Sequence, residues 1–371
     1  MKNKKIMMLA TTDNMIWQFL IPHIHHLQAL GNTVECVCAR TGFWFEELET
    51  KYNLTMHEID FARNPITPKN LKSYKSLVKL QKECNFDLVY CQQPVGGLMG
   101  RLIGKKFKIP VIYTAHGFHF YNGCPLKNKL IYKTVEKWLS KYTDALITIN
   151  DEDYQNALKF KAKSVYKING IGIDLKKFSP EKAMSKAEAR KMLGLKSDDF
   201  VVLSIGELNE NKNTYRLLES IKNIDNEKIK YVICGQGPLK EKYENYIKAN
   251  SLEGRVFMLG FRKDIPDIVS ASDLYIMPSY REGLGMATLE SMSFGLPAIV
   301  SDTRGCRDLV GDNEGGILCN PNETEDFTNG ILKLYADKQF YAECSKRNKE
   351  HVKQFDVKYV KKQLEEIYKN F

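Results

Sequence analysis

Residues 274–290 of this 371-residue chain read LYIMPSYREGLGMATLE, and this stretch decides the fold. Its apolar start, Leu274–Met277, predicts a buried strand that ends at Pro278. Gly283 and Gly285 then predict a tight turn, and the apolar spacing after them predicts a helix. A buried strand that runs through a glycine turn into a helix indicates a parallel α/β sheet.

The same alternation of short β-branched runs and helical periodicity extends in both directions. In the first half the predicted strands are Lys5–Leu9, Thr33–Ala39, Asp87–Tyr90, Val111–Thr114, Ala145–Ile149 and Val165–Ile168. In the second half they are Phe200–Ile205, Tyr231–Cys234, Val256–Leu259, Leu274–Met277, Ala298–Ser301 and Ile317–Cys319. Two series of six strands predict two doubly wound, Rossmann-like α/β domains.

A break in this alternation predicts the domain boundary. The segment Asn169–Asp174 holds two glycines, and Pro180, which discourages a helix, follows it. We expect an N-terminal domain over 1–172, a C-terminal domain over 173–352, and a helix over 353–371 that packs back toward the first domain. Two similar domains are expected to face a cleft, with ligands at the carboxyl ends of the strands.

The composition excludes several protein classes. Hydrophobic residues make up 43% and charged residues 27%, which excludes a disordered or fibrous chain. No apolar run approaches the ~18 residues that span a bilayer. The apolar segment 6–10 is too short for a signal-peptide core, so we expect a protein inside the cell. The nine cysteines are scattered and include no CxxC pair. We therefore expect reduced thiols, without disulfides and without a structural metal site.

The excess positive charge lies in the first half of the chain. The net charge is +10, and residues 1–172 hold 24 Lys+Arg against 14 Asp+Glu, a difference of +10. The first half is therefore expected to meet an anionic partner. The sequence has no recognition motif for nucleic acid, so we do not expect nucleic acid as a partner.

Two basic amphipathic segments carry much of this charge. In Pro125–Tyr142 lysines recur every four residues beside an apolar stripe that includes Trp138, and Lys69–Lys82 is similar. A basic helix with an aromatic residue on its apolar side suits anionic lipid headgroups. A solvated lysine face over a stripe that packs into the core would give the same pattern.

The glycine turn of the opening stretch also indicates a ligand. Gly283 and Gly285 allow the backbone to approach a ligand closely, and the helix start behind them suits a phosphate. Glu290 lies about two helical turns further on, where a carboxylate could bind vicinal hydroxyls such as a ribose diol. A glycine-rich turn with surface glutamates would show the same spacing.

A second acidic motif, Asp151-Glu-Asp153, has the D-x-D form of a metal site in a different transferase architecture. It lies between a predicted strand and a predicted helix, where Asp is expected as a helix cap. We interpret it as a cap.

The Glu282-x7-Glu290 pattern, together with other motifs in order, resembles glycosyltransferase family 4, retaining enzymes of the GT-B fold that use nucleotide-sugar donors. The other matching segments are Thr114–Phe120, Asn169–Pro180, Gly206–Asn213, Gly235–Pro238 and Gly260–Arg262. The resemblance covers nearly the whole chain, and the ordered set of motifs is far more specific than any single piece.

The resemblance implies a role for each matching position. The catalytic residues would be His116, Lys212 and Glu282, with Lys212 holding the diphosphate. The donor would be bound by Gly206, Asn213, Gly237, Arg262, Gly283, Leu284, Gly285, Met286 and Glu290. On the acceptor side we expect Thr12, Asp13 and His119.

The chain departs from the family pattern at two places. Many members carry Arg where this chain has Glu207, so Arg216, Arg262 or Arg281 would have to supply the second cation. The segment Thr11–Asn14 replaces the common glycine-rich loop.

The expected function is retaining transfer of a hexose or N-acetylhexosamine from a UDP-sugar to a hydroxyl of a polyprenyl-diphosphate-linked glycan. The protein would use no metal or other cofactor, and it would bind the cytoplasmic face of the membrane through its basic N-terminal domain in bacterial polysaccharide synthesis. A nucleotide-sugar epimerase and a non-catalytic sugar-nucleotide-binding subunit are the alternatives. The sequence argues against an NAD enzyme, because Gly235-x-Gly237 lacks the third glycine of that fingerprint and the ribose-binding acid at the expected distance.

Overall fold

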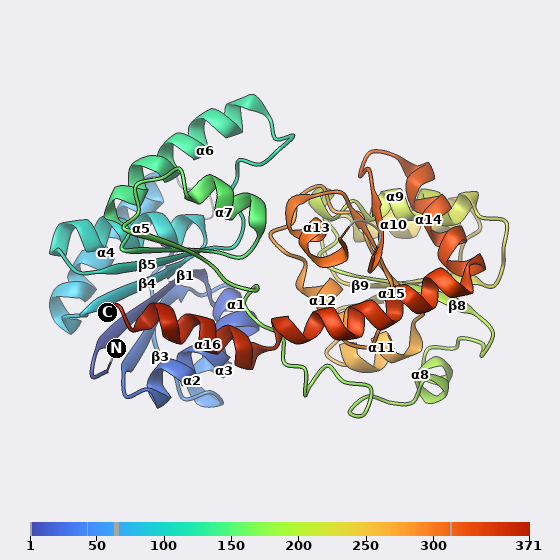
Figure 1. Ribbon diagram of the computed structural model, residues 1–371, viewed down its shortest axis with the longest axis horizontal. Coiled ribbons are helices and arrows are strands. Elements are labelled where there is room, and N and C mark those ends of the chain that lie inside the picture. The colour runs from blue at the N-terminus through green and yellow to red at the C-terminus, as the bar shows by residue number, and fades with distance from the viewer. Residues whose placement is uncertain (1, 43, 63–66, 312–313) are drawn as a thin grey trace. The chain divides into compact units, whose positions relative to one another are not determined.

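The computed structural model of this chain describes residues 2–42, 44–62, 67–311 and 314–371. It divides into two compact units, which are described separately (Figure 1). Unit 1 comprises Met1–Gly172 and Val357–Phe371, and unit 2 comprises Ile173–Asp356.

Unit 1 is built on a seven-stranded parallel sheet with the order β3-β2-β1-β4-β5-β6-β7. The strands are β1 (Lys5–Thr12), β2 (Thr33–Ala39), β3 (Thr55–Glu58), β4 (Leu88–Gln92), β5 (Val111–Ala115), β6 (Ala145–Thr148) and β7 (Ser164–Lys167). The expectation of six strands was wrong here, because β3 was missed. Its sequence, Thr-Met-His-Glu, holds a single apolar residue, and none of its residues is fully buried.

The helices of unit 1 cover both faces of this sheet (Figure 1). They are α1 (Asp13–Met15), η1 (Ile16–Leu20), α2 (Ile21–Ala29), α3 (Trp44–Thr50), α4 (Pro68–Cys84), α5 (Pro94–Phe107), α6 (Leu126–Leu139), η2 (Ser140–Tyr142), α7 (Asp151–Ala157) and α16 (Val357–Tyr368). Figure 1 shows α4, α5 and α6 on one face, with α2, α3 and α16 on the other. The closing helix α16 buries Val360, Leu364 and Ile367, the residues that its helical period places on one side.

Unit 2 is built on a six-stranded parallel sheet with the order β10-β9-β8-β11-β12-β13. The strands are β8 (Phe200–Ile205), β9 (Ile229–Cys234), β10 (Val256–Gly260), β11 (Leu274–Met277), β12 (Ala298–Ser301) and β13 (Gly316–Cys319). The helices are α8 (Lys186–Met192), η3 (Glu210–Lys212), α9 (Thr214–Asn223), α10 (Lys240–Ala249), α11 (Ile265–Ala271), α12 (Met286–Met292), α13 (Arg304–Val310), α14 (Thr324–Ala336), α15 (Lys338–His351) and η4 (Val352–Phe355). All six predicted strands of this half are present.

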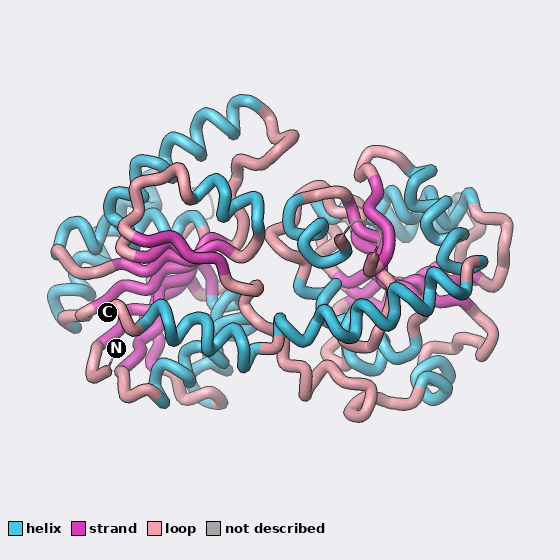
Figure 2. The backbone as a smooth tube through the Cα atoms, in the orientation of Figure 1, coloured by secondary structure: helices cyan, strands magenta, loops and turns pink. Residues whose placement is uncertain are grey.

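The strand order of each sheet reverses direction at one point, and this point indicates where a ligand would bind. In unit 1 the order reverses between β1 and β4, and in unit 2 between β8 and β11. In such sheets the loops that leave the carboxyl ends of those two strands diverge and form a crevice for a ligand. Figure 2 shows the strands of each sheet running between their helices.

None of the described helices is both long enough and apolar enough to cross a bilayer.

Candidate active site

Lys212 and Glu282 meet at the switch point of unit 2. The Nζ of Lys212 lies 2.5 Å from Oε1 of Glu282, and both side chains are largely buried. Lys212 ends the short helix η3 in the loop after β8, and Glu282 lies in the loop after β11. The aliphatic part of Lys212 passes over Gly206, where a Cβ would lie 3.2 Å from Cε of the lysine. Because Gly206 has no side chain, the side chain of Lys212 can pass over it and extend into the crevice.

Hydrogen bonds to backbone carbonyls join the two loops that carry this pair. The Nδ2 of Asn213 donates to the carbonyl of Pro278 at 3.1 Å. The amide of Tyr280 donates to the carbonyl of Asn211 at 2.9 Å, and Nδ2 of Asn211 donates to the carbonyl of Arg281 at 3.0 Å. A small cavity of about 10 Å³ lies between these loops. The cation and the carboxylate are thus held on one cross-linked frame.

The glycine turn leads into α12 as the sequence predicts. Gly285 has a φ of 90° at the start of the helix, a left-handed backbone that favours glycine. Glu290 follows on the second turn. The packing around its carboxyl raises the pKa of Glu290 to about 7, an effect that the nearby Lys177 partly offsets. Glu290 can therefore change charge near neutral pH.

The loops after β9 and β10 extend this edge of the sheet. A Cβ on Gly237 would lie 2.4 Å from the carbonyl oxygen of Leu208, so only glycine allows the two loops to pack this closely. Leu208 also donates its amide to the carbonyl of Gln236 at 2.9 Å. Arg262, after the outer strand β10, forms an ion pair with Asp264, with Nε at 2.8 Å from Oδ1. Its guanidinium is therefore already neutralised.

His116 lies in unit 1, in the loop after β5. Its Nε2 is 2.7 Å from Oε1 of Gln92, the last residue of β4. Burial lowers the pKa of His116 to about 4, and the coulombic effect of His23 adds to the shift. The imidazole is neutral at physiological pH, where it can donate from one ring nitrogen and accept at the other.

The three residues predicted on the acceptor side have different surroundings. Thr12 ends β1 and is almost fully buried. Asp13 is completely buried, and its carboxylate accepts hydrogen bonds from the amides of Thr41 and Asn14. It therefore positions loops at this edge from within the fold. His119 packs against the ring of Tyr132 on α6, with centroids 5.0 Å apart.

The D-x-D motif is structural, but its cap is the residue before it. The side chain of Asn150 accepts from the amide of Asp153 at 2.8 Å and caps α7, so the expectation of an Asp cap was wrong. Asp151 forms an ion pair with Lys167 at 2.5 Å. The carboxylate of Asp153 accepts the amide of Phe118 at 3.1 Å and so holds the loop that carries His116.

A groove of about 930 Å³ in unit 2 lies at the opposite edge of the sheet, where β8 begins. Five of its charged residues pair with one another. Asp273 binds both Lys186 and Arg190 at 2.6 Å, and Asp198 binds Lys228 at 2.9 Å. Because these charges are already paired within the protein, we interpret this groove as structural. We place the candidate active site at the carboxyl ends of the strands, although the cavity there is smaller.

The comparisons with known proteins agree with this geometry. Residues 5–150 match a family model described as glycosyl transferase 4-like, and residues 185–351 match one described as glycosyl transferases group 1. The chain is 33% identical over 98% of its length, and 96% of the other chain, to EpsD of Bacillus subtilis (strain 168), a protein named as a glycosyltransferase. The chain belongs to glycosyltransferase family 4.

Other relatives of this glycosyltransferase extend the comparison. It is 37% identical, over 75% of its length and 73% of the other chain, to an Escherichia coli protein. That relative is named UDP-Gal:alpha-D-GlcNAc-diphosphoundecaprenol alpha-1,3-galactosyltransferase. The crystal structure of Anabaena Alr3699/HepE in complex with UDP and glucose superimposes with a TM-score of 0.83 at 20% identity, covering 100% of both chains. The fold of this glycosyltransferase is GT-B.

Sequence reasoning missed several residues at the crevice of this glycosyltransferase. Arg304, at the start of α13, donates from Nε to the carbonyl of Glu282 at 3.1 Å. A Cβ on the next residue, Gly305, would lie 2.1 Å from the carbonyl oxygen of Gly283. Ser279 is completely buried beside the small cavity, and no described residue hydrogen-bonds its hydroxyl. Arg304 lies 22 positions beyond its partner, and no spacing rule predicts such a contact.

Proposed function

We propose that this glycosyltransferase transfers a hexose or N-acetylhexosamine, with retention, from a UDP-sugar to a hydroxyl of a polyprenyl-diphosphate-linked glycan. The product would serve bacterial cell-surface polysaccharide synthesis at the cytoplasmic face of the membrane. The observation that carries the proposal is the Lys212–Glu282 pair at the switch point of unit 2, with Glu290 eight residues further on. The E. coli relative, whose name gives a UDP-linked donor and a diphosphoundecaprenol-linked acceptor, supports the choice of substrates.

In the proposed reaction the bond between the sugar C1 and the β-phosphate oxygen breaks, and C1 bonds to the acceptor oxygen on the same face. The departing phosphate oxygen takes the proton of the acceptor hydroxyl, so no protein nucleophile is needed. Lys212 stabilises the negative charge that develops on the diphosphate, which is the main catalytic effect in this scheme. Glu282 accepts hydrogen bonds from the sugar hydroxyls once the donor engages Lys212.

The remaining residues bind and orient the substrates. Glu290, when ionised, accepts two hydrogen bonds from the ribose diol, and backbone groups near Arg262 contact the base. His116 acts as a neutral hydrogen-bonding group on the acceptor unit, because its pKa of about 4 keeps it uncharged. We propose that no metal ion takes part, since Lys212 and backbone amides supply the positive charge that a cation would provide.

The second cation of the donor site is proposed to be Arg281. Of the three candidates, Arg262 pairs with Asp264, and Arg216 contacts Glu219 and Thr324 at 3.2 and 2.9 Å. Arg281 directly precedes Glu282 and, among the described residues, makes no side-chain ion pair. Replacing it by Ala is expected to weaken UDP binding.

The test is UDP release from a panel of UDP-sugars with and without a lipid-linked diphosphate acceptor. Acceptor-dependent release with formation of an extended glycolipid supports the proposal. Conversion of the donor sugar without acceptor would indicate an epimerase, and UDP binding without turnover would indicate a non-catalytic subunit. Thermal unfolding with UDP, GDP and ADP tests the nucleotide separately, because a ligand at about 100 times its Kd stabilises by about 2.7 kcal/mol.

A further inference from the structure

We propose that helix α6 binds an anionic membrane surface, lying in the lipid interface with its outward face toward the acyl chains. This inference deepens the proposed function and rests on it in one respect, because an enzyme with a lipid-linked acceptor must work at a membrane. The binding itself is a property of α6 and can be measured without donor or acceptor.

Most of the large apolar residues of α6 point outward, whereas Leu139 at its end packs into the core. Leu126 is 77% exposed, Leu130 is 70% exposed and Trp138 is 44% exposed. Ile131 and Val135 are exposed too. An ordinary surface helix buries its apolar stripe and exposes its polar one. For α6 the exposure of these residues therefore favours a lipid-facing stripe over one that packs into the core.

The charge of the outward face is purely positive. Lys127, Lys129 and Lys137 are exposed beside the apolar residues. The single acidic residue of α6, Glu136, is turned inward, where Arg101 binds both of its carboxylate oxygens at 2.6 and 3.2 Å. An apolar stripe flanked by lysines complements anionic headgroups above acyl chains, and it has no acidic group that would repel them.

The inward face holds α6 firmly on unit 1. Arg101 of α5 is completely buried, donates from Nε to the carbonyl of Gly97 at 2.8 Å, and stacks over the ring of Tyr113 at 4.1 Å. The bidentate bond to Glu136 thus ties α6 to α5. The outward face is in this way presented by a fixed helix, which lowers the entropy cost of binding.

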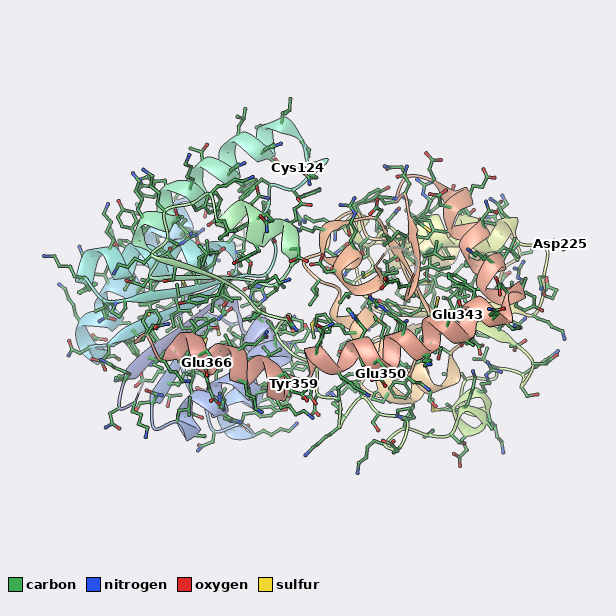
Figure 3. All side chains as sticks on the ribbon, in the orientation of Figure 1. Cys124, Asp225, Glu343, Glu350, Tyr359 and Glu366 are labelled. Carbon is green, nitrogen blue, oxygen red and sulfur yellow. The ribbon has the colours of Figure 1, made fainter. Side chains whose placement is uncertain are left out.

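The two ends of α6 fit an interfacial position. At its carboxyl end Trp138 and Tyr142 form an edge-to-face pair, and Nζ of Lys105 lies over both rings at 5.7 and 4.4 Å. Such an aromatic and basic cluster is typical of the headgroup level of a membrane. The amino-terminal half extends away from the rest of unit 1 (Figure 1), and Cys124, labelled in Figure 3, lies just before it.

Helix α4 is equally rich in lysine, but it has no exposed apolar stripe between its lysines. Its Lys69 pairs with Asp60 at 2.7 Å, and its Lys79 lies 3.7 Å from Glu83. Its single large exposed apolar residue is Leu71, at 62%. We interpret α4 as a solvated basic face. It supplies matched control positions on the same unit.

The experiment is co-sedimentation of the full-length protein with vesicles of equal parts phosphatidylglycerol and phosphatidylcholine, and with phosphatidylcholine alone. We expect binding to the mixed vesicles, and Leu126→Glu/Leu130→Glu is expected to lower the partition coefficient about tenfold or more. Leu71→Glu, an equally exposed leucine on α4, should bind like the wild type. Lys127→Glu/Lys137→Glu should also weaken binding several-fold, whereas Lys72→Glu/Lys75→Glu on α4 should have a much smaller effect.

Two results would overturn the inference. One is a failure to bind as expected: either both α6 variants partition onto the mixed vesicles as strongly as the wild type, or the wild type does not partition at all. The other is a wild-type dimer in sedimentation velocity, without vesicle binding, that Leu126→Glu/Leu130→Glu converts to monomers, because the α6 face would then bind a second copy. The vesicles hold no donor or acceptor, so failure of the proposed transfer reaction would leave the binding result intact. Conversely, the α6 variants should keep full activity on a short-chain, water-soluble acceptor.

Discussion

The Lys212–Glu282 ion pair holds the lysine that would stabilise the leaving diphosphate in the proposed reaction. A lysine ammonium is a compact charge that can pass from a carboxylate to a phosphate oxygen without a change in the backbone. The pair joins residues 70 positions apart, and both side chains are partly shielded from water. The carboxylate that would contact the sugar in the proposed reaction therefore also holds the lysine ammonium in place.

Replacing Lys212 by Ala is expected to lower kcat by about 10²–10³-fold, because charge on the leaving diphosphate loses its main stabilising group. UDP release from the preferred UDP-sugar measures this. The matched control is Lys240→Ala in the same unit, whose ammonium lies 3.5 Å from Glu244 on the surface of α10. Lys240→Ala should keep wild-type activity, and an equal loss in both variants would contradict the assigned role.

The pKa of Glu290 gives a second prediction. Burial raises this pKa to about 7, so the carboxyl is neutral below that pH and ionised above it. Only the ionised form accepts two hydrogen bonds from a ribose diol. UDP affinity is therefore expected to rise as the pH increases from about 6 to about 8.

Calorimetric titration with UDP across this range measures the effect. In Glu290→Gln the affinity should be lower at the upper end and nearly independent of pH. A pH profile that is the same in the variant and the wild type would show that another group titrates.

At the scale of single residues, the sequence predicts which residues gather at the site better than it predicts their contacts. Gly285 and Glu290 follow from one local strand–turn–helix pattern, whereas Glu282 follows only from the resemblance to a known family. The contact between Arg304 and Glu282 depends on two loops that meet only in the folded sheet, so no local spacing encodes it. Asp13 shows the converse, since a polar residue at the end of a strand can serve the fold by accepting backbone amides.

Elements differ in how clearly the sequence specifies them. Buried central strands such as β8 have continuous apolar runs and were predicted at their observed bounds. The outer strand β3 is mostly polar and only partly buried, so periodicity gives no signal for it. Helical spacing showed that α6 has an apolar stripe. It could not show which side packs inward, because the inward anchor is a buried ion pair with another helix.

That anchor leads to a prediction for the stability of unit 1. Arg101→Met leaves the carboxylate of Glu136 buried without its partner, which is expected to cost about 3–5 kcal/mol of unfolding free energy. Urea unfolding followed by circular dichroism measures the loss. Lys106→Met, an exposed lysine on the same helix, is the control and should change stability by less than about 0.5 kcal/mol. A loss for Arg101→Met no larger than this would show that Glu136 finds water or another partner.

At the scale of the whole molecule, both units use one plan, a parallel sheet whose strand order reverses once. The plan was readable from the strand–helix alternation, because it is repeated along the chain. The two halves differ in charge, with the excess of +10 in residues 1–172. This asymmetry fits our proposal, in which unit 2 would bind the nucleotide and unit 1 would meet the lipid-linked acceptor.

The whole reaction is expected to proceed without a metal ion. The two aspartates of the D-x-D motif are engaged, Asp151 by Lys167 and Asp153 by Asn150 and the amide of Phe118. Among the described residues the only cluster of metal-binding side chains is Glu35, His57 and Cys84, where Lys5 already binds Glu35 at 2.8 Å. The initial rate of UDP release should therefore stay within about twofold when EDTA replaces Mg²⁺, since Lys212 and backbone amides stabilise the leaving group. Loss of activity in EDTA that Mn²⁺ or Mg²⁺ restores would show that a cation bridges the diphosphate, and Lys212 would then have a supporting role.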